Sequence, residues 1–505
     1  MESNYFHDAG FNDVLYEWMS RAPWLAVSAV AHVIVILVLM AIPWDLIQRR
    51  ERAVILSGVV PALDEPLFDE PPPEEQKVIE DELVEPQLID SDLPEIEDEE
   101  SVDLGDPSID LLGTSGLDEL AELENDSIIG IGPGDLGGPK GARFGQGRDR
   151  GGDGTEPALE AGLDWLARHQ SPDGSWDCDG FMRNCPDTGV GVCSGAGEAA
   201  HDLGMTGLAL LAFLGDGNTT RVGPHRELVA RGVNWLRQQQ DSGSGLFGQR
   251  IGHSFMYDHA IATLAMCEAY YFSKSPLIKG SAQAAIDFIS RARNPYGAWR
   301  YDSPPTGEND TSVTAWMVFA LRSAEDGGLV IDRAAYQGAM SWFDEVTEPG
   351  TARVGYDSVG SLSSRISGLN DHYPAESGEA MTASALLCRF FLGQDPADLP
   401  IMKRQAALLR AKLPEWDPDG LQNDMYYWYY GSYAMFQMGG SEFWIPWNKA
   451  LKKAVLDSQR TTGDERGSWD PKDPWGISGG RVYSTALMVL CLEVYFRYAR
   501  VLGAR

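Results

Sequence analysis

The sequence predicts an all-α protein in which six helical hairpins close into an (α/α)6 toroid, joined by a disordered acidic linker to one transmembrane helix. Three observations predict this: a helical repeat fills the last 350 residues, two kinds of helix alternate within it, and one long apolar run precedes an acidic stretch. We expect an N-terminal tail at 1–23, a transmembrane helix at 24–44, an acidic Pro-rich linker at 45–129, a glycine-rich linker at 130–155 and the toroid at 156–505.

The two kinds of helix differ in how much of their surface is apolar. The first kind has apolar residues at i, i+4 and i+7, which form one stripe, and its stripes begin at Leu159, Val229, Ala282, Ala335, Met402 and Trp447. The second kind is apolar on nearly every side and occupies 205–215, 260–270, 312–321, 380–393, 429–439 and 482–496. Aligning the second kind places in register Thr206, Ala262, Thr314, Thr382, Tyr430 and Thr485.

This alternation predicts two concentric rings. A helix that is apolar all round must be covered all round, whereas a striped helix can leave one side in water. We therefore expect the second kind inside and the first kind outside. The inner helices would then run parallel, and their N-termini would meet at one mouth.

The loops between the helices carry a repeated motif. Residues 170–176 read QSPDGSW, residues 293–299 read RNPYGAW, and 459–469 keeps the same ends around an insertion, with eroded copies at 240–247 and 354–356. The glutamine can cap helix ends, the glycine turns the chain, and the tryptophan packs into the hairpin junction. The motif resembles the Q-x-x-x-G-x-W repeat of squalene and oxidosqualene cyclases and of protein prenyltransferases. This resemblance covers about 350 residues and implies the toroid, not an activity.

The residues that carry the chemistry of those families are altered. The resemblance implies a D-x-D-D-T motif at an inner-helix start, and here Asp310 and Thr311 remain while Asn309 replaces the proton donor. An amide is not a general acid, which leaves Glu308 or Asp310 as the candidate catalytic acid. Prenyltransferases hold zinc with an Asp-x-Cys pair and a later histidine, but here Ser312 replaces the cysteine. We therefore expect no metal and no cofactor.

Acids and aromatic residues gather at the predicted mouth. The acids at inner-helix starts are Asp202, Asp258, Glu379 and Asp424, and we favour helix capping over an acidic rim or metal site for them. The aromatic residues either fill the ring centre or line a pocket for an apolar ligand. The predicted pocket residues are Trp299, Tyr301, Asn309, Trp316, Tyr426, Trp428, Asp258 and His259.

Three of the six cysteines, Cys178, Cys185 and Cys193, share one loop. If the domain is exported, two of them can form a disulfide. The alternative is a zinc site with His201, but the spacing matches no usual zinc module. We favour the disulfide.

The N-terminal apolar run extends from Trp24 to Trp44, and its length of about 30 Å suits one membrane span. His32 lies deep within it and Ser28 lies one turn earlier on the same face, so this face is predicted to contact a membrane partner. The pair and the layout resemble the anchor of TonB-type energy-transducing proteins, which implies a proton-channel motor complex as partner. The alternative is that Ser28 bonds a helix carbonyl and His32 stays neutral.

The distribution of charged residues bears on two questions: which partners the protein can have, and on which side of the membrane its C-terminal domain lies. The net charge is −35, and residues 64–126 hold 25 acids and one base. Such a segment stays extended and disfavours nucleic acid as a partner. Arg49, Arg50 and Arg52 follow the span, which by the positive-inside rule favours a cytoplasmic domain. The TonB-like layout favours a single-pass inner-membrane protein with an exported C-terminal domain, which is our prediction.

Three functions remain open. The first is a membrane-anchored toroid that is an inactive relative of terpene cyclases and binds an isoprenoid-like ligand or a protein partner. The second is a divergent terpene or squalene cyclase. The third is an energy-coupled structural protein that transmits force through its tether. We favour the first.

Overall fold

The computed structural model describes residues 32–33, 151–186, 192–366 and 368–497, and the last three ranges belong to one compact unit. The predicted tail and both linkers, up to residue 150, lie outside the described residues, and so does the predicted membrane span apart from His32 and Val33. Ser28 is outside them as well. Within the described residues, no helix has the length and apolar character needed to cross a membrane.

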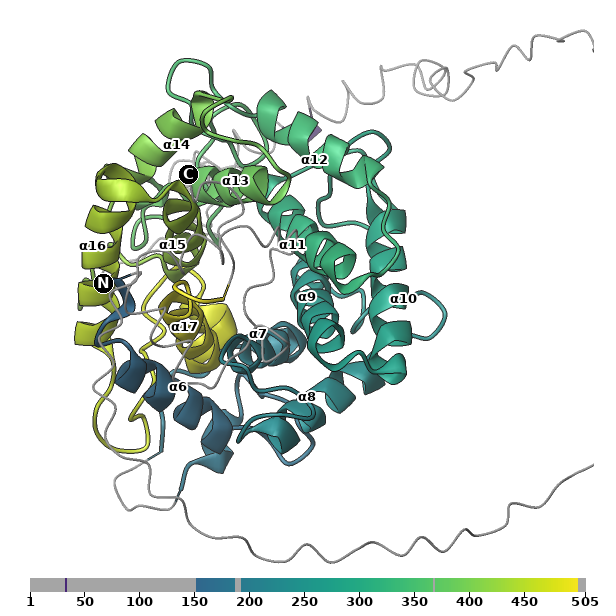
Figure 1. Cartoon of the computed structure of the whole chain (residues 1–505), viewed down its shortest axis with the longest axis vertical. Helices are drawn as coiled ribbons and strands as arrows, with labels where there is room; N and C mark the ends of the chain where they lie inside the picture. The colour runs from purple at the N-terminus through teal and green to yellow at the C-terminus, as the bar shows by residue number, and fades with distance from the viewer. Residues whose placement is uncertain (1–31, 34–150, 187–191, 367, 498–505) are drawn as a thin grey trace, which may run out of the picture. The chain divides into compact units, whose positions relative to one another are not determined.

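Six helices of the described chain form an outer ring (Figure 1). Each of them buries residues along one stripe. They are α6 (Glu156–Arg168), α8 (Arg226–Gln238), α10 (Pro276–Ala292), α12 (Ala334–Glu345), α14 (Ile401–Arg410) and α16 (Ile445–Ser458). The buried residues of α8 are Leu228, Val229, Gly232, Val233 and Leu236, the pattern of a helix that leaves its other side in water.

Six further helices form the inner ring, and nearly all of their residues are buried. They are α7 (Asp202–Gly215), α9 (Phe255–Ser273), α11 (Thr311–Gly327), α13 (Ala380–Phe391), α15 (Met425–Met438) and α17 (Gly476–Leu492). Each inner helix packs on the next, and α17 returns to α7, so the ring is closed. The short helices η3 (Phe181–Asn184), η4 (Ala199–His201), η5 (Ala375–Ser377) and η6 (Gly440–Trp444) lie in the connections. No β-strand occurs in the described part of the chain, only isolated bridges. The predicted all-α double ring is confirmed.

The loop motif holds adjacent hairpins together. The Gln170 side chain donates to its own loop at the Gly174 carbonyl and to the Leu228 carbonyl of the next outer helix, each at 3.0 Å. Gln459 does the same at the end of the chain, with 2.9 Å to the Gly467 carbonyl and 2.7 Å to Ala158 of α6. One type of contact therefore links neighbouring hairpins and also joins the last hairpin to the first.

The glycine of the motif is required by a close approach. Gly467 has a φ of +94°, and a Cβ there would lie 2.0 Å from the Ala161 carbonyl oxygen of α6. Only glycine combines that conformation with that contact. The tryptophans anchor the hairpins, because the indole of Trp469 donates to the Val455 carbonyl and that of Trp299 to the Ile289 carbonyl, both at 2.8 Å.

One inner helix differs from the predicted register. The backbone N–H of Trp176 donates to Thr206 Oγ1 at 2.9 Å, and Trp299 and Trp469 bond Thr314 and Thr485 in the same way. In the second repeat the Phe247 N–H donates to His259 Nδ1 at 3.0 Å. His259, not Ala262, therefore occupies the equivalent position in α9. The predicted alignment was wrong by about one turn, because a helix that is apolar on every side offers no local signal for which of its turns contacts the loop.

Candidate functional site

A cavity of about 450 Å³ opens where the inner helices begin. The first turns of the inner helices contribute to its wall Met205, Tyr257, Ser312, Met381, Tyr426 and Ser478. Their N-termini therefore share one mouth, as the sequence predicted. Long connections complete the wall with residues 301, 356 and 363–366.

The wall of this cavity is largely aromatic and aliphatic. Its rings are those of Tyr257, Tyr301, Trp316, Tyr356, Tyr426, Trp475 and Tyr483, and aliphatic groups come from Leu208, Ile261 and Leu487. The hydroxyls of Tyr257 and Ser312 bond each other, as do those of Tyr301 and Tyr356. These four hydroxyls are satisfied within the wall, whereas the Tyr426 hydroxyl and the Trp475 indole N–H have no hydrogen-bond partner among the described residues. The rest of the surface presented to a ligand is mainly apolar.

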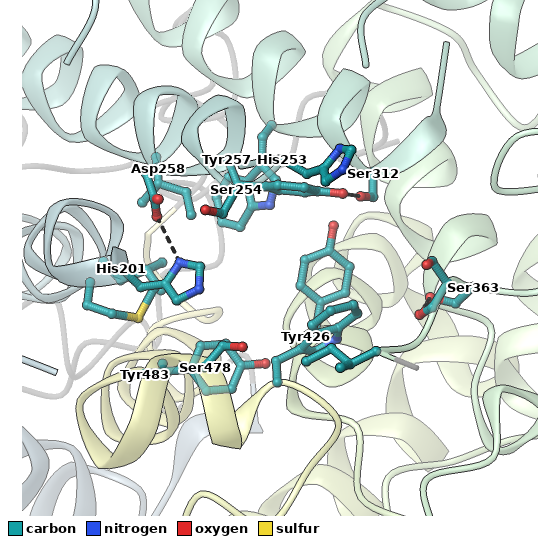
Figure 2. Close-up of a pocket in the computed structure, with 18 of the residues that line it drawn as sticks. His201, His253, Ser254, Tyr257, Asp258, Ser312, Ser363, Tyr426, Ser478 and Tyr483 are labelled. Atoms are coloured by element: carbon teal, nitrogen blue, oxygen red, sulfur yellow. Dashed lines mark hydrogen bonds and ion pairs between the residues drawn. The ribbon is translucent and has the colours of Figure 1, made fainter. Parts of the chain in front are cut away.

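One titratable pair faces the cavity. His201 Nδ1 lies 3.5 Å from Asp258 Oδ1, and Figure 2 shows the two side chains directed at each other, His201 from the end of η4 and Asp258 from α9. Burial raises the pKa of Asp258. The hydrogen bond to Asp258 raises the pKa of His201. A buried acid beside a proton-accepting imidazole is an arrangement that can transfer a proton.

Two other ionisable side chains in the wall, those of Arg365 and Tyr483, are held by partners. Arg365 lines the wall, but its guanidinium pairs with Asp424 Oδ2 at 2.7 Å and donates to the Tyr373 carbonyl at 3.1 Å. Tyr483 donates to Asp473 Oδ2 at 3.0 Å. Burial raises the pKa of Asp473 to about 7.

The acids predicted at helix starts have separate tasks. Asp310 and Asp424 cap α11 and α15 by accepting the Val313 and Tyr427 N–H groups at 2.7 and 2.9 Å. Asp202 accepts the Cys178 N–H at 2.7 Å.

Glu379 instead pairs with Arg353 at 2.7 Å and with Lys412 at 3.1 Å. Capping therefore describes two of the acids at inner-helix starts, while Asp258 faces the cavity.

The predicted catalytic acids do not line the cavity. Glu308 is an exposed side chain paired with Arg300 at 2.9 Å. Asn309 Oδ1 accepts the Ala298 N–H at 2.9 Å and so fixes its own loop. Asp310 is fully buried, its Oδ2 has no hydrogen-bond partner among the described residues, and burial raises its pKa to about 7.

The predicted pocket residues divide into two groups. Tyr301, Trp316, Tyr426 and Asp258 line the cavity. Trp299 and His259 bond the hairpin junctions, and Trp428 is buried in α15 without lining the cavity. Sequence reasoning missed the aliphatic lining residues Leu208, Ile261 and Leu487, which lie beyond the first turns of uniformly apolar inner helices. It also missed Tyr356, which ends the eroded motif copy at 354–356, and Arg365, which comes from a long connection without a repeat pattern.

The three loop cysteines are all free in the structure, so it holds no disulfide between them. Cys178 is buried beside Asp202, whereas Cys185 and Cys193 both face His169. His201, the histidine considered with them on sequence grounds, instead faces the cavity.

Comparison with known proteins relates part of the chain to one cyclase. No family model matches the sequence. A squalene–hopene cyclase of Bradyrhizobium diazoefficiens is 26% identical over 192 residues, which are 35% of this chain and 27% of that protein. The chain thus matches about a quarter of the length of that curated relative.

Solved structures of similar arrangement have low sequence identity. A GH76 α-mannanase of Bacteroides thetaiotaomicron is 12% identical with a TM-score of 0.47, covering 71% of this chain and 98% of the enzyme. A type II terpene cyclase from Scytonema is 14% identical with a TM-score of 0.42, covering 70% and 98%. The closed double ring of helices makes the chain an α/α toroid, with a local sequence similarity to a squalene–hopene cyclase.

Proposed function

We propose that the toroid binds an apolar ligand of the isoprenoid class in the cavity at its mouth. The observation that carries this proposal is the lining: aromatic and aliphatic groups surround about 450 Å³, a size typical of small-molecule sites. Four of the cavity hydroxyls, those of Tyr257, Ser312, Tyr301 and Tyr356, are paired within the wall, so an apolar ligand need not break these pairs. The partial similarity to a squalene–hopene cyclase supports an isoprenoid over other apolar ligands.

The positions expected to supply the acid argue for binding over catalysis. Glu308 lies at the surface, Asn309 is an amide committed to its loop, and Asp310 caps a helix outside the cavity wall. An enzyme that protonates an alkene needs its acid in contact with the substrate. None of these three residues meets that requirement.

A second part of the proposal concerns the location of the protein in the cell and rests on its N-terminal segment. We propose that residues 24–44 anchor the chain in the inner membrane, with the toroid exported on its acidic tether. The anchor's polar face at Ser28 and His32 would contact a membrane partner such as a proton-channel motor complex. This part is supported by the sequence alone: an apolar run of suitable length with two polar residues on one face.

A binding assay tests the ligand. The full-length protein in detergent is titrated with geranylgeraniol and, as a matched control, with a straight-chain alcohol of similar length, and quenching of tryptophan fluorescence is followed. Met381→Trp, which fills the cavity from α13, should lose binding. Leu277→Trp on the exposed face of α10 should keep it. Equal binding by both variants at unchanged melting temperature would refute the proposal.

A divergent cyclase is the second candidate, and one observation favours it. Asp258 and His201 place a buried acid and a base on an aromatic cavity wall, where rings can stabilise a cation. If the chain is a cyclase, Asp258 is the acid. Incubation with squalene and with geranylgeranyl diphosphate should then give cyclic products that vanish in Asp258→Asn and persist in Glu308→Gln. No product from either substrate would leave binding as the function.

The anchor has its own test. Ser28→Ala and His32→Ala should lose membrane partners that copurify with the wild type, whereas Ser3→Ala in the N-terminal tail should keep them. Unchanged copurification in both anchor variants would remove the motor-complex proposal without affecting the ligand.

A further inference from the structure

Away from the cavity, one imidazole and two thiols converge in the connection between α6 and η4. His169 Nε2 lies 3.4 Å from Cys185 Sγ and 3.4 Å from Cys193 Sγ. All three ligand atoms lie within 4.8 Å of one another. His169 is fully buried and Cys193 nearly so, while Cys185 is half-buried. Three residues that are well separated in the sequence are therefore brought to one point.

The hydrogen bonds of His169 leave its Nε2 free to act as a ligand. His169 Nδ1 lies 2.7 Å from the Trp165 carbonyl oxygen. A carbonyl only accepts, so Nδ1 carries the proton and Nε2 presents its lone pair to the two sulfurs. The ring also stacks on Trp165 at 4.1 Å between centroids and meets the edge of Phe181. A metal-bound imidazole is usually fixed in this way, by donating its other N–H to a carbonyl.

The distances match a metal site better than a pair of thiol hydrogen bonds. One lone pair on Nε2 cannot accept fully from two S–H donors at once, yet both sulfurs lie at the same distance from it. A tetrahedral zinc with Zn–S near 2.3 Å and Zn–N near 2.05 Å sets its sulfur and nitrogen ligands about 3.6 Å apart. The observed separations fall within about 0.2 Å of that value.

We propose that His169, Cys185 and Cys193 form a zinc site. Thiolate and imidazole are the ligand types that zinc prefers. Two thiolates also balance the double charge of the ion, so a buried complex carries no net charge. The Cys193 backbone N–H donates to Cys185 Sγ at 3.2 Å, which stabilises that sulfur as a thiolate. The described residues supply three ligands, and the half-buried Cys185 side leaves the fourth position to water.

The site occupies the seam where the ring closes. His169 follows the end of α6, and the chain after Cys193 runs along α17. There the Arg481 N–H donates to the Gly195 carbonyl, and the Glu198 N–H donates to the Ser478 carbonyl, both at 2.8 Å. Zinc would therefore join the first outer helix to the segment that packs on the last inner helix. We expect metal binding to stabilise the closed ring.

The test measures metal directly on the full-length protein. Protein stripped with a chelator under reducing conditions is given Zn²⁺ and desalted, and bound metal is determined by elemental mass spectrometry. We expect about one zinc per chain and a higher melting temperature than for the stripped protein. With Co²⁺ as a probe, we expect a thiolate-to-metal charge-transfer band. Cys185→Ser, Cys193→Ser and His169→Asn should each weaken metal binding at least about tenfold, whereas Cys178→Ser, in the same loop, should bind normally.

A second measurement uses only the wild type, so its result does not depend on whether a variant folds. Zinc should protect Cys185 and Cys193 of the wild type from alkylation, as mapped by peptide mass spectrometry. Absence of stoichiometric zinc, or equal alkylation of both cysteines with and without zinc, would overturn the proposal. So would metal binding that persists in the cysteine variants, or a Cys185–Cys193 disulfide in protein isolated without reductant.

Discussion

Asp310 should make the fold less stable as the pH rises, and replacing it with asparagine should remove that dependence. The carboxyl is fully buried, Oδ1 caps α11 and Oδ2 has no hydrogen-bond partner among the described residues. Burial raises its pKa from an ordinary 3.8 to about 7. Since a tenfold change in proton affinity is about 1.4 kcal/mol, ionised Asp310 destabilises the folded state by about 4 kcal/mol.

The sign follows from which state holds the proton more tightly. The folded state binds it more tightly than the unfolded state, so the contribution of Asp310 is most favourable below pH 3.8 and is lost as the pH rises toward 7. Asparagine is as good an N-cap as aspartate and does not ionise. The stability of Asp310→Asn relative to wild type should therefore increase by about 2 kcal/mol between pH 5 and pH 7.

Urea unfolding followed by tryptophan fluorescence, at several pH values, measures this difference. Comparing variants at each pH cancels the contributions of other buried acids such as Asp473. Glu308→Gln is the matched control, because Glu308 is an exposed carboxylate two residues away and should leave the pH dependence unchanged. A stability difference between Asp310→Asn and wild type that stays constant from pH 5 to pH 7 would show that the carboxyl is not held in a low-dielectric site.

Three further predictions concern closure of the ring. Gly467→Ala should lower the free energy of unfolding by more than about 1 kcal/mol, because its φ is +94° and the new Cβ would meet Ala161. The control is Gly280→Ala on α10, where nothing lies within 4 Å, and it should stabilise the fold by up to about 1 kcal/mol. Equal effects of the two substitutions in urea titrations would contradict the argument. Gln459→Leu should cost about 1–3 kcal/mol, because it leaves the Ala158 and Gly467 carbonyls without this donor, and thermal melts that match wild type would refute it. Deleting residues 1–150 should leave a helical domain that melts cooperatively, since Gly151 bonds Asn448 of α16 and the inner ring closes on itself; circular dichroism showing a non-cooperative melt would count against this.

The helical repeat could be predicted from the sequence because the apolar pattern of each helix depends only on residues within that helix. Each helix carries its own pattern, and a rod without a polar side can only be placed inside, as α7 and α13 are. Because α9 is apolar on every side, its alignment with the other inner helices was mispredicted, and His259 takes the place predicted for Ala262. Apolar pattern therefore fixed which ring a helix joins but not which turn meets the loop.

The site residues were harder to predict because their roles depend on direction. Asp258 and Asp310 both lie at inner-helix starts, yet one faces the cavity and the other turns back to cap its own helix. Nothing in the local sequence separates these outcomes, since either satisfies a carboxylate near a helix N-terminus.

By itself, the sequence determined the all-α class, the six hairpins and the common mouth, because helical periodicity and the need to bury apolar faces act over a few turns. Only the tertiary structure decided which residues line the cavity and which histidine meets Cys185 and Cys193. Those contacts join segments whose separation in the chain is set by irregular loops, and no periodic pattern records how such loops fold back.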